Sequence, residues 1–328
     1  MVKITAFAKF DLAIHIEPKK TSDGYYHVHY IDCQLDLCDR LLFEPEEGKI
    51  EIIHNSPELS VTKDNFVYKA AILLKEMVGK KRLGAKITLV KNIPIKAGFG
   101  GGSSDAAATI LGLSRLWKVK LNDNQIKRVA RDLGKDFYYS YYGKVSEVVG
   151  KGKNYEIMPL RSRLPKFWLL VVVPDVEKPS TGWVYEHLRT KNIGRNFDKQ
   201  SFSTNKNLSF AQNLDSRFAR IKQSFSTNRQ SLSTNKIEKL KTAILKSDKM
   251  GILKNLTNDF EDSVFSYYPI IGEIKDDLAR VGAQAAIMAG SGFSVVGFFD
   301  SRKKAERVKW EFEGRKGIKQ ILVAKTVN

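Results

Sequence analysis

A glycine-rich run at residues 97–108 is the part of the sequence best suited to chemistry. It reads Ala-Gly-Phe-Gly-Gly-Gly-Ser-Ser-Asp-Ala-Ala-Ala. Glycine adopts positive φ angles readily and leaves its N–H uncovered, so this run can bring backbone donors close to phosphate oxygens. Ser103 and Ser104 are residues that favour helix starts, and the positive end of a helix dipole stabilises an anion. The run therefore predicts a phosphate-binding loop that opens into a helix.

Two commoner nucleotide-binding motifs do not fit this run. A Walker A loop needs Ser or Thr after Gly-Lys, and the pairs at 79–80, 143–144 and 150–151 lack that follower. A Rossmann fingerprint needs glycine where Ser103 stands, and no clear acidic-ended strand follows the helix. A purely structural glycine turn is the remaining alternative. The folding entropy that each glycine costs disfavours it for so many glycines together.

The elements that must position the loop are strands on one side and helices on the other. Before residue 100, β-branched or alternating patterns predict strands at Ile4–Ile16, Tyr26–Leu37, Leu41–Ile53 and Ala85–Val90. Helical spacing predicts helices at Asn65–Met77, Ser103–Trp117 and Asn122–Leu133, the last capped by Gly134.

A second set of elements follows a boundary that we expect near residues 161–165. Strands are predicted at Phe167–Val173, Ala285–Met288, Ser294–Phe299 and Gln320–Lys325. Helices are predicted at Lys236–Leu256, at Ile270–Val281 and from Arg302 onward. This organisation predicts an N-terminal domain at residues 1–162 and a C-terminal domain at 163–328.

The C-terminal domain contains a polar repeat at about residues 190–235. The phrase Gln-Ser-Phe-Ser-Thr-Asn occurs at 200–205 and 223–228, and a leucine version follows at 230–235. Such a segment buries too little apolar surface to offset its ordering entropy, so we expect a mobile surface insertion. Its excess of basic residues leaves a second interpretation, an arm that touches an acidic partner.

Composition limits the cellular compartments and the binding partners that we expect for this protein. The longest apolar run, Phe167–Val173, is too short to span a bilayer, and the N-terminus lacks a signal-peptide pattern. Cys33 and Cys38 should point to opposite faces of a strand, so we expect reduced thiols and a cytoplasmic protein. The net charge of +19 fits a nucleic-acid partner or an anionic small substrate, but a general excess of lysine is the interpretation that we favour. No nucleic-acid motif accompanies it, and we expect a monomer or a weak homodimer without a membrane partner.

The segment from Lys91 to Ala108 resembles the central phosphate-binding motif of the GHMP kinases, the superfamily of galactokinase, homoserine kinase and mevalonate kinase. Its triple glycine and Ser-Ser-Asp-Ala-Ala are most similar to the 4-diphosphocytidyl-2-C-methyl-D-erythritol kinases within that superfamily. Other segments match in order: Ala6–Leu12, Asp23–Tyr25, Gly134–Asp136, Pro179–Tyr185, Asn258–Glu261 and Met288–Gly292.

The resemblance implies an α+β fold, the two-domain GHMP kinase fold with a ribosomal-S5-like N-terminal domain and a ferredoxin-like C-terminal domain. It also implies transfer of the γ-phosphoryl group of ATP to the 2-hydroxyl of a cytidine-diphosphate-linked methylerythritol, a small polyol. This step belongs to non-mevalonate isoprenoid synthesis.

Site residues follow from the resemblance by position. Lys9 and Asp136 would form the catalytic pair. The triphosphate would lie against Pro94, Ala97, Gly98, Phe99, Gly100, Gly101, Gly102, Ser103 and Ser104. The substrate would contact Asp11, Tyr25, Tyr26, His27 and Asp136. Mg²⁺ would bridge the phosphates with help from the hydroxyl of Ser103 or Ser104.

Lysine and aspartate suit this reaction, because phosphoryl transfer needs positioning and charge neutralisation more than covalent help. By itself Lys9 would read as an ordinary strand residue and Asp136 as a helix cap. Only their spacing to the glycine run makes catalysis the better interpretation. His27 and His29 also suggest a metal site, but two histidines without a third ligand favour ordinary surface or strand residues.

This sequence departs from the family pattern at two positions. Asp11 replaces the usual asparagine, and Tyr26 stands where the family has a histidine that reads the cytosine, with His27 one step later. A slip of one residue turns a strand side chain to the opposite face. Two alternatives therefore stay open. One is a GHMP kinase for another small alcohol, of the mevalonate, homoserine or sugar type, and the other is a catalytically silent nucleotide-binding homologue.

Overall fold

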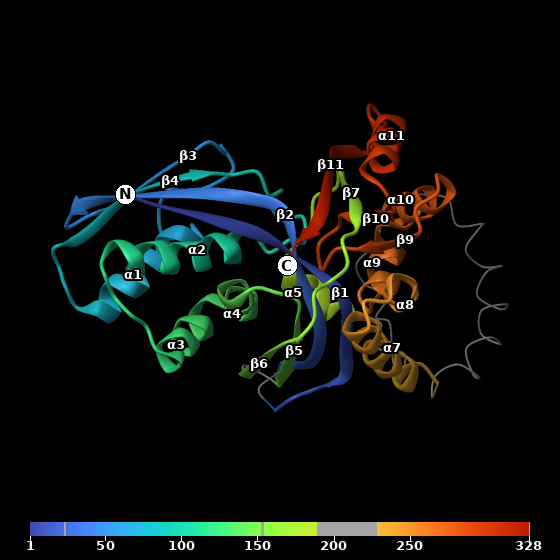
Figure 1. Cartoon of the computed structure of the whole chain (residues 1–328), viewed down its shortest axis with the longest axis horizontal. Helices are drawn as coiled ribbons and strands as arrows, with labels where there is room; N and C mark the ends of the chain where they lie inside the picture. The colour runs from blue at the N-terminus through green and yellow to red at the C-terminus, as the bar shows by residue number, and fades with distance from the viewer. Residues whose placement is uncertain (23, 152–153, 189–227, 328) are drawn as a thin grey trace, which may run out of the picture.

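The computed structural model describes residues 1–22, 24–151, 154–188 and 228–327. Two long strands, β1 (Val2–Lys20) and β2 (Tyr26–Glu47), form an antiparallel pair that runs through the middle of the molecule (Figure 1). The sheet continues from β2 through β4 (Leu83–Val90) to β3 (Ile50–His54), and β5 (Ser146–Lys151) and β6 (Asn154–Pro159) extend it on another side.

Four helices cover one side of the long strands in the N-terminal half (Figure 1). They are α1 (Phe66–Val78), α2 (Gly101–Leu116), α3 (Asp123–Leu133) and α4 (Lys135–Tyr142). Their apolar faces bury a core against β2 and β4 that includes Phe43, Leu74 and Ile110. Close packing requires glycine at position 112, because a Cβ on Gly112 would lie 2.2 Å from the ring of Phe43.

The C-terminal half contains the antiparallel strands β7 (Trp168–Pro174), β9 (Ala285–Met288), β10 (Val295–Phe299) and β11 (Ile318–Val327), and the two-residue strand β8 (Thr257–Asn258). Its helices are α5 (Thr181–Glu186), α7 (Asn228–Leu245), α8 (Lys249–Lys254), α9 (Glu261–Tyr267), α10 (Pro269–Arg280) and α11 (Arg302–Phe312).

Two strand pairings join the halves within the described residues. Strand β11 pairs with β7 along most of its length and with Leu35 and Gln34 of β2 at its end. Strand β8 pairs in parallel with Ala13 and Ile14 of β1. No helix in the described residues is both long and apolar enough to cross a membrane.

Two elements differ from the sequence expectations. The strands expected at Tyr26–Leu37 and Leu41–Ile53 are one strand, β2, followed by β3, because β4 pairs with β2 from Arg40 onward. The helix expected at Lys236–Leu256 is two, α7 and α8. Ser247 lies between them with a positive φ of 54°, and Asp248 caps the second.

The polar repeat falls partly inside the described residues. Residues 189–227 lie outside them, but the last copy of the phrase belongs to α7, which begins at Asn228. The backbone of this last copy is therefore helical. The same helix continues into Ile237, Leu240 and Ile244, which are buried, and this packing accounts for the order of the helix. The domain limits at 162 and 163 stay a prediction.

Candidate active site

The glycine loop, residues 97–102, connects the two halves of the molecule. Its Gly98 has a φ of 97°, and a Cβ there would lie 2.1 Å from the carbonyl oxygen of Ala289. A Cβ on Gly292 would likewise lie 2.4 Å from the Cα of Gly98. The loop therefore rests directly on the backbone of residues 289–292, and this contact requires glycine on both sides.

The helix that follows begins two residues earlier than expected, at Gly101. Gly100 is its N-cap, has a φ of 61° and offers no side chain to bond the first-turn N–H groups. Those N–H groups have no partner within a helix, so they remain available to an anion. The backbone N–H of Lys9 donates to the carbonyl of Phe99 at 3.0 Å, which holds the loop against β1.

The two serines of the first turn have different surroundings. Ser103 lies on the cleft. Ser104 is buried, and its hydroxyl donates to the carbonyl of Phe7 at 2.7 Å, which fastens α2 to β1. Of the two hydroxyls expected to help hold Mg²⁺, the one on Ser103 is the better placed.

Lys9 lies between two carboxylates. Its Nζ is 2.5 Å from Oδ1 of Asp11 and 3.7 Å from Oδ1 of Asp136. The side chain is nearly fully buried, and burial by itself lowers its pKa. The charges of Asp11 and Asp136 outweigh burial and raise the pKa of Lys9 well above its usual range, so the ammonium stays charged.

Asp136 is the second residue of helix α4, directly after Lys135. The Nζ of Lys135 is 2.6 Å from Oδ1 of Asp136 and 4.2 Å from the ring centroid of Tyr30. Burial favours the neutral acid, but Lys135 and Lys9 hold the pKa of Asp136 well below its usual range. The carboxylate is ionised at neutral pH and about a third exposed, at 33%.

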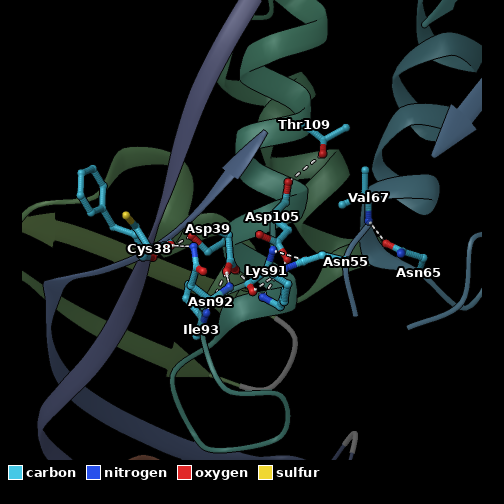
Figure 2. Close-up of polar contacts among 12 residues, drawn as sticks. Cys38, Asp39, Asn55, Asn65, Val67, Lys91, Asn92, Ile93, Asp105 and Thr109 are labelled. Atoms are coloured by element: carbon cyan, nitrogen blue, oxygen red, sulfur yellow. Dashed lines mark hydrogen bonds and ion pairs between the residues drawn. The ribbon is translucent and has the colours of Figure 1, made fainter. Parts of the chain in front are cut away.

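A second lysine cluster braces the segment that precedes the loop (Figure 2). The Nζ of Lys91 pairs with Asp39 of β2 and, at 3.0 Å, with Asp105 of α2. Asp39 also accepts the backbone N–H groups of Asn92 at 2.6 Å and Ile93 at 2.8 Å. A Cβ on Gly101 would lie 2.8 Å from this Nζ, so the cluster lies directly beneath the start of α2.

A cleft of about 910 Å³ runs between the two halves. All the expected site residues line it except Ser104 and His27. The expected residues that line it are Lys9, Asp11, Tyr25, Tyr26, Pro94, Ala97, Gly98, Phe99, Gly100, Gly101, Gly102, Ser103 and Asp136.

Tyrosines also line the cleft, among them Tyr25, Tyr26 and Tyr185. The ring of Tyr26 stacks on that of Tyr185, with centroids 5.9 Å apart and an angle of 22° between the planes. The hydroxyl of Tyr185 is 2.7 Å from that of Tyr30, and Tyr25 is 44% exposed. A flat aromatic ligand would find suitable partners here.

The histidines point elsewhere. Nδ1 of His27 is 3.5 Å from Oε2 of Glu17, and Nε2 of His29 is 2.8 Å from Oε1 of Glu147. Across the described part of the chain, no three metal-ligating side chains gather.

Three charged residues of the site escaped the sequence reasoning. Asp32 lies opposite Asp11 in the pairing of β1 with β2. Lys135 directly precedes Asp136, and its position next to a candidate catalytic residue could have identified it from the sequence. Lys178 has its Nζ 3.2 Å from the hydroxyl of Thr181 and 3.4 Å from that of Ser291.

Lys178 is distinct because no acidic side chain within the described ranges lies within 4 Å of its Nζ. Burial lowers its pKa to about 8. The charge of Asp136 opposes this change, whereas the charges of Lys9 and Lys96 lower the pKa further. It is a cation that faces the cleft without a counterion, and such a group favours a bound anion.

Comparison with known proteins agrees with this geometry. A family model described as "GHMP kinases N terminal domain" matches residues 65–144, and one described as "GHMP kinases C terminal" matches residues 240–317. A relative from Streptococcus agalactiae is 32% identical over 95% of this chain and 93% of its own length. The 4-diphosphocytidyl-2-C-methyl-D-erythritol kinase of Bacillus cereus is 30% identical over 98% of this chain and 95% of its own. The chain belongs to the GHMP kinase family.

Solved structures agree in fold. A crystal structure of 4-(cytidine 5'-diphospho)-2C-methyl-D-erythritol kinase matches this GHMP kinase with a TM-score of 0.71, covers 99% of each chain and is 23% identical. A crystal structure of L. major mevalonate kinase in complex with R-mevalonate matches with a TM-score of 0.69, covers 99% of this chain and 96% of that chain, and is 16% identical. The resemblance and the two-domain α+β fold expected from the sequence are thus confirmed.

Proposed function

We propose that this GHMP kinase transfers the γ-phosphoryl group of ATP to the 2-hydroxyl of 4-diphosphocytidyl-2-C-methyl-D-erythritol, in non-mevalonate isoprenoid precursor synthesis. The observation that carries the proposal is the placement of Lys9 and the ionised Asp136 in one cleft with the glycine loop. The Bacillus cereus relative, named for that activity, supports the choice of substrate.

The glycine loop suits a triphosphate. The first-turn N–H groups of α2 and the charge of Lys9 would meet the phosphate oxygens, and the closely packed glycines leave no side chain in the way. The hydroxyl of Ser103 is the one that would help hold Mg²⁺, which prefers phosphate oxygens and water as its other ligands. When bound, the ion neutralises phosphate charge.

Asp136 would orient the acceptor hydroxyl. Its low pKa makes it a weak base, so it accepts a hydrogen bond in the ground state. It takes the proton only as the hydroxyl oxygen bonds to the γ-phosphorus and the bond from that phosphorus to ADP breaks. Lys9 stabilises the charge that spreads over the transferred oxygens, since such reactions depend mainly on positioning and electrostatics.

The tyrosines would bind the cytidine end of the substrate. Tyr25 is the exposed ring, and the Tyr26–Tyr185 pair forms a fixed wall beside it. His27 would need to leave Glu17 in order to reach the cleft. Cys33 and Cys38 are both free thiols, which supports a cytoplasmic location for this reaction.

Turnover with purified protein tests the proposal. ATP consumption would be measured with Mg²⁺ and 4-diphosphocytidyl-2-C-methyl-D-erythritol, beside parallel reactions with mevalonate, homoserine and galactose. The cytidylyl substrate should be the fastest, and Asp136→Asn should remove the turnover. Faster reaction of another alcohol would favour the alternative that Asp11 and Tyr26 raise. ATP binding without turnover of any acceptor would favour a silent homologue.

A further inference from the structure

Asp11 and Asp32 face each other inside the protein. They are paired residues on β1 and β2, and each is only 1% exposed. Oδ1 of Asp11 bonds to Lys9, whereas Oδ2 of Asp11 and Oδ1 of Asp32 are buried and accept no hydrogen bond from any described residue. Two buried carboxylates side by side repel each other strongly if both are ionised.

One proton on either carboxylate would satisfy both orphan oxygens, because the two residues are paired across β1 and β2. We propose that Asp11 and Asp32 hold a single proton between them and that Asp32 thereby acts as a positioning residue for Lys9. Burial, followed by the charge of Asp11, raises the pKa of Asp32 well above its usual range, although Lys9 and Lys135 oppose the rise.

The local charge balance supports a monoanionic pair. Lys9 and Lys135 contribute two positive charges, and Asp136 contributes one negative charge. The other titratable groups close to the pair are neutral, because burial raises the pKa of each: Tyr30, Cys33 and Tyr139. A pair with one proton makes the cluster neutral, whereas two ionised carboxylates would leave a buried negative charge next to the phosphate loop.

A single negative charge also sets the position of Lys9. Two charges on the pair would draw the ammonium toward the strands and away from Asp136. No charge would leave Asp136 as its only acidic partner. The observed distances of 2.5 Å to Asp11 and 3.7 Å to Asp136 place Lys9 between these limits. Asp32 thus acts on the reaction through Asp11 and Lys9 and touches neither substrate.

Infrared difference spectroscopy on the full chain without substrate tests the shared proton. Wild type minus Asp32→Asn at pH 7 should show the carbonyl band of a protonated carboxyl. Asp36→Asn serves as the matched control, because Asp36 lies on the same strand and accepts the N–H of Lys325 at 2.7 Å outside the pair. Its difference spectrum should show only ionised carboxylate bands. If the spectrum of wild type minus Asp32→Asn also shows only ionised carboxylate bands, the proposal is overturned.

A double-mutant cycle tests the positioning role. This part of the proposal rests on the proposed kinase function. Asp11→Asn and Asp32→Asn each keep one negative charge on the pair, so each should lower kcat less than tenfold. The double variant removes that charge and should lose about tenfold more than the product of the single effects. KM for ATP should change less than kcat, and Asp32→Leu should lose activity that Asp32→Asn retains.

The shared proton and the positioning role can be refuted separately. If Asp32 does not position Lys9, the double variant should have the same kcat as Asp11→Asn. That result would refute the positioning role even if the carboxyl band were present. If no acceptor alcohol is phosphorylated, the proposed function fails, and the spectrum still decides whether the proton is shared.

Discussion

Replacing Lys178 with methionine should stabilise the folded protein. Burial holds the pKa of Lys178 at about 8, below its ordinary value of 10.5, so the unfolded chain binds this proton more tightly than the folded chain does. A difference of this size corresponds to about 3 kcal/mol at neutral pH, since one pKa unit is worth about 1.4 kcal/mol. Partial exposure and the loss of two long hydrogen bonds to hydroxyls, about 0.5 kcal/mol each, reduce the expected gain to about 1–2 kcal/mol.

The sign of the pH dependence follows from the same shift. The penalty is fully present below pH 8, falls as the pH rises from 8 toward 10.5 and is gone above that range. The stability advantage of Lys178→Met should therefore be largest at pH 7 and close to zero by pH 10. The variant should also bind ATP or substrate more weakly, because it removes a cation from the cleft.

Urea unfolding at pH 7 and pH 10 measures both effects, with the midpoint and slope followed by circular dichroism. Lys316→Met, at an exposed loop position, is the matched control and should leave stability within about 0.5 kcal/mol of wild type. An unchanged or lower stability of Lys178→Met at pH 7 would refute the reasoning. A gain of equal size at pH 10 would show that the charge of Lys178 is not its cause.

Three further predictions concern the loop and the catalytic pair. Asp136→Asn should lower kcat by about 100-fold or more while ATP affinity, measured by calorimetry, stays near that of wild type; equal kcat would overturn the assigned role. Gly98→Ala should destabilise the protein by about 2 kcal/mol or more in thermal unfolding, because of its positive φ and the contact with Ala289. Gly314→Ala, which has a positive φ in open space, should cost less, and equal costs would contradict the contact argument. Lys91→Met should cost about 3–5 kcal/mol in urea unfolding, because buried Asp39 loses its counterion and Asp105, whose pKa burial raises, loses its hydrogen-bond donor; a loss below about 1 kcal/mol would contradict the counterion argument.

Local signals explain what the sequence could predict. The glycine loop, the helix after it and the caps at Asn65 and Asn122 depend on neighbouring residues, and their helices lie within two residues of the expected limits. The start of α2 moved from Ser103 to Gly101 because the loop uses its backbone rather than a serine side chain as the cap. The candidate pair of Lys9 and Asp136 came from the family resemblance, since neither residue type nor spacing alone singles it out.

Long-range pairing explains what the sequence could not predict. Asp32 meets Asp11 only through the register of β1 and β2, which contains irregularities on both sides of Lys9 and Asp11. Lys178 reaches the cleft because the C-terminal half packs against the glycine loop, a contact between positions far apart in the chain. The continuity of β2 likewise depends on β4, which pairs with it along Arg40–Glu47.

The support beneath Gly98 has a consequence for synthesis on the ribosome. The loop rests on the backbone of residues 289–292, so its own strand and helix emerge long before the surface that holds it. At about 5–20 residues per second, the interval between the two segments is about 10–40 s. During that time the nascent chain exposes a glycine-rich turn whose shape is not yet fixed, and ATP would bind only weakly to it. We expect a ribosome-stalled chain ending near residue 250 to retain little ATP, and release of the full chain to restore the nucleotide site.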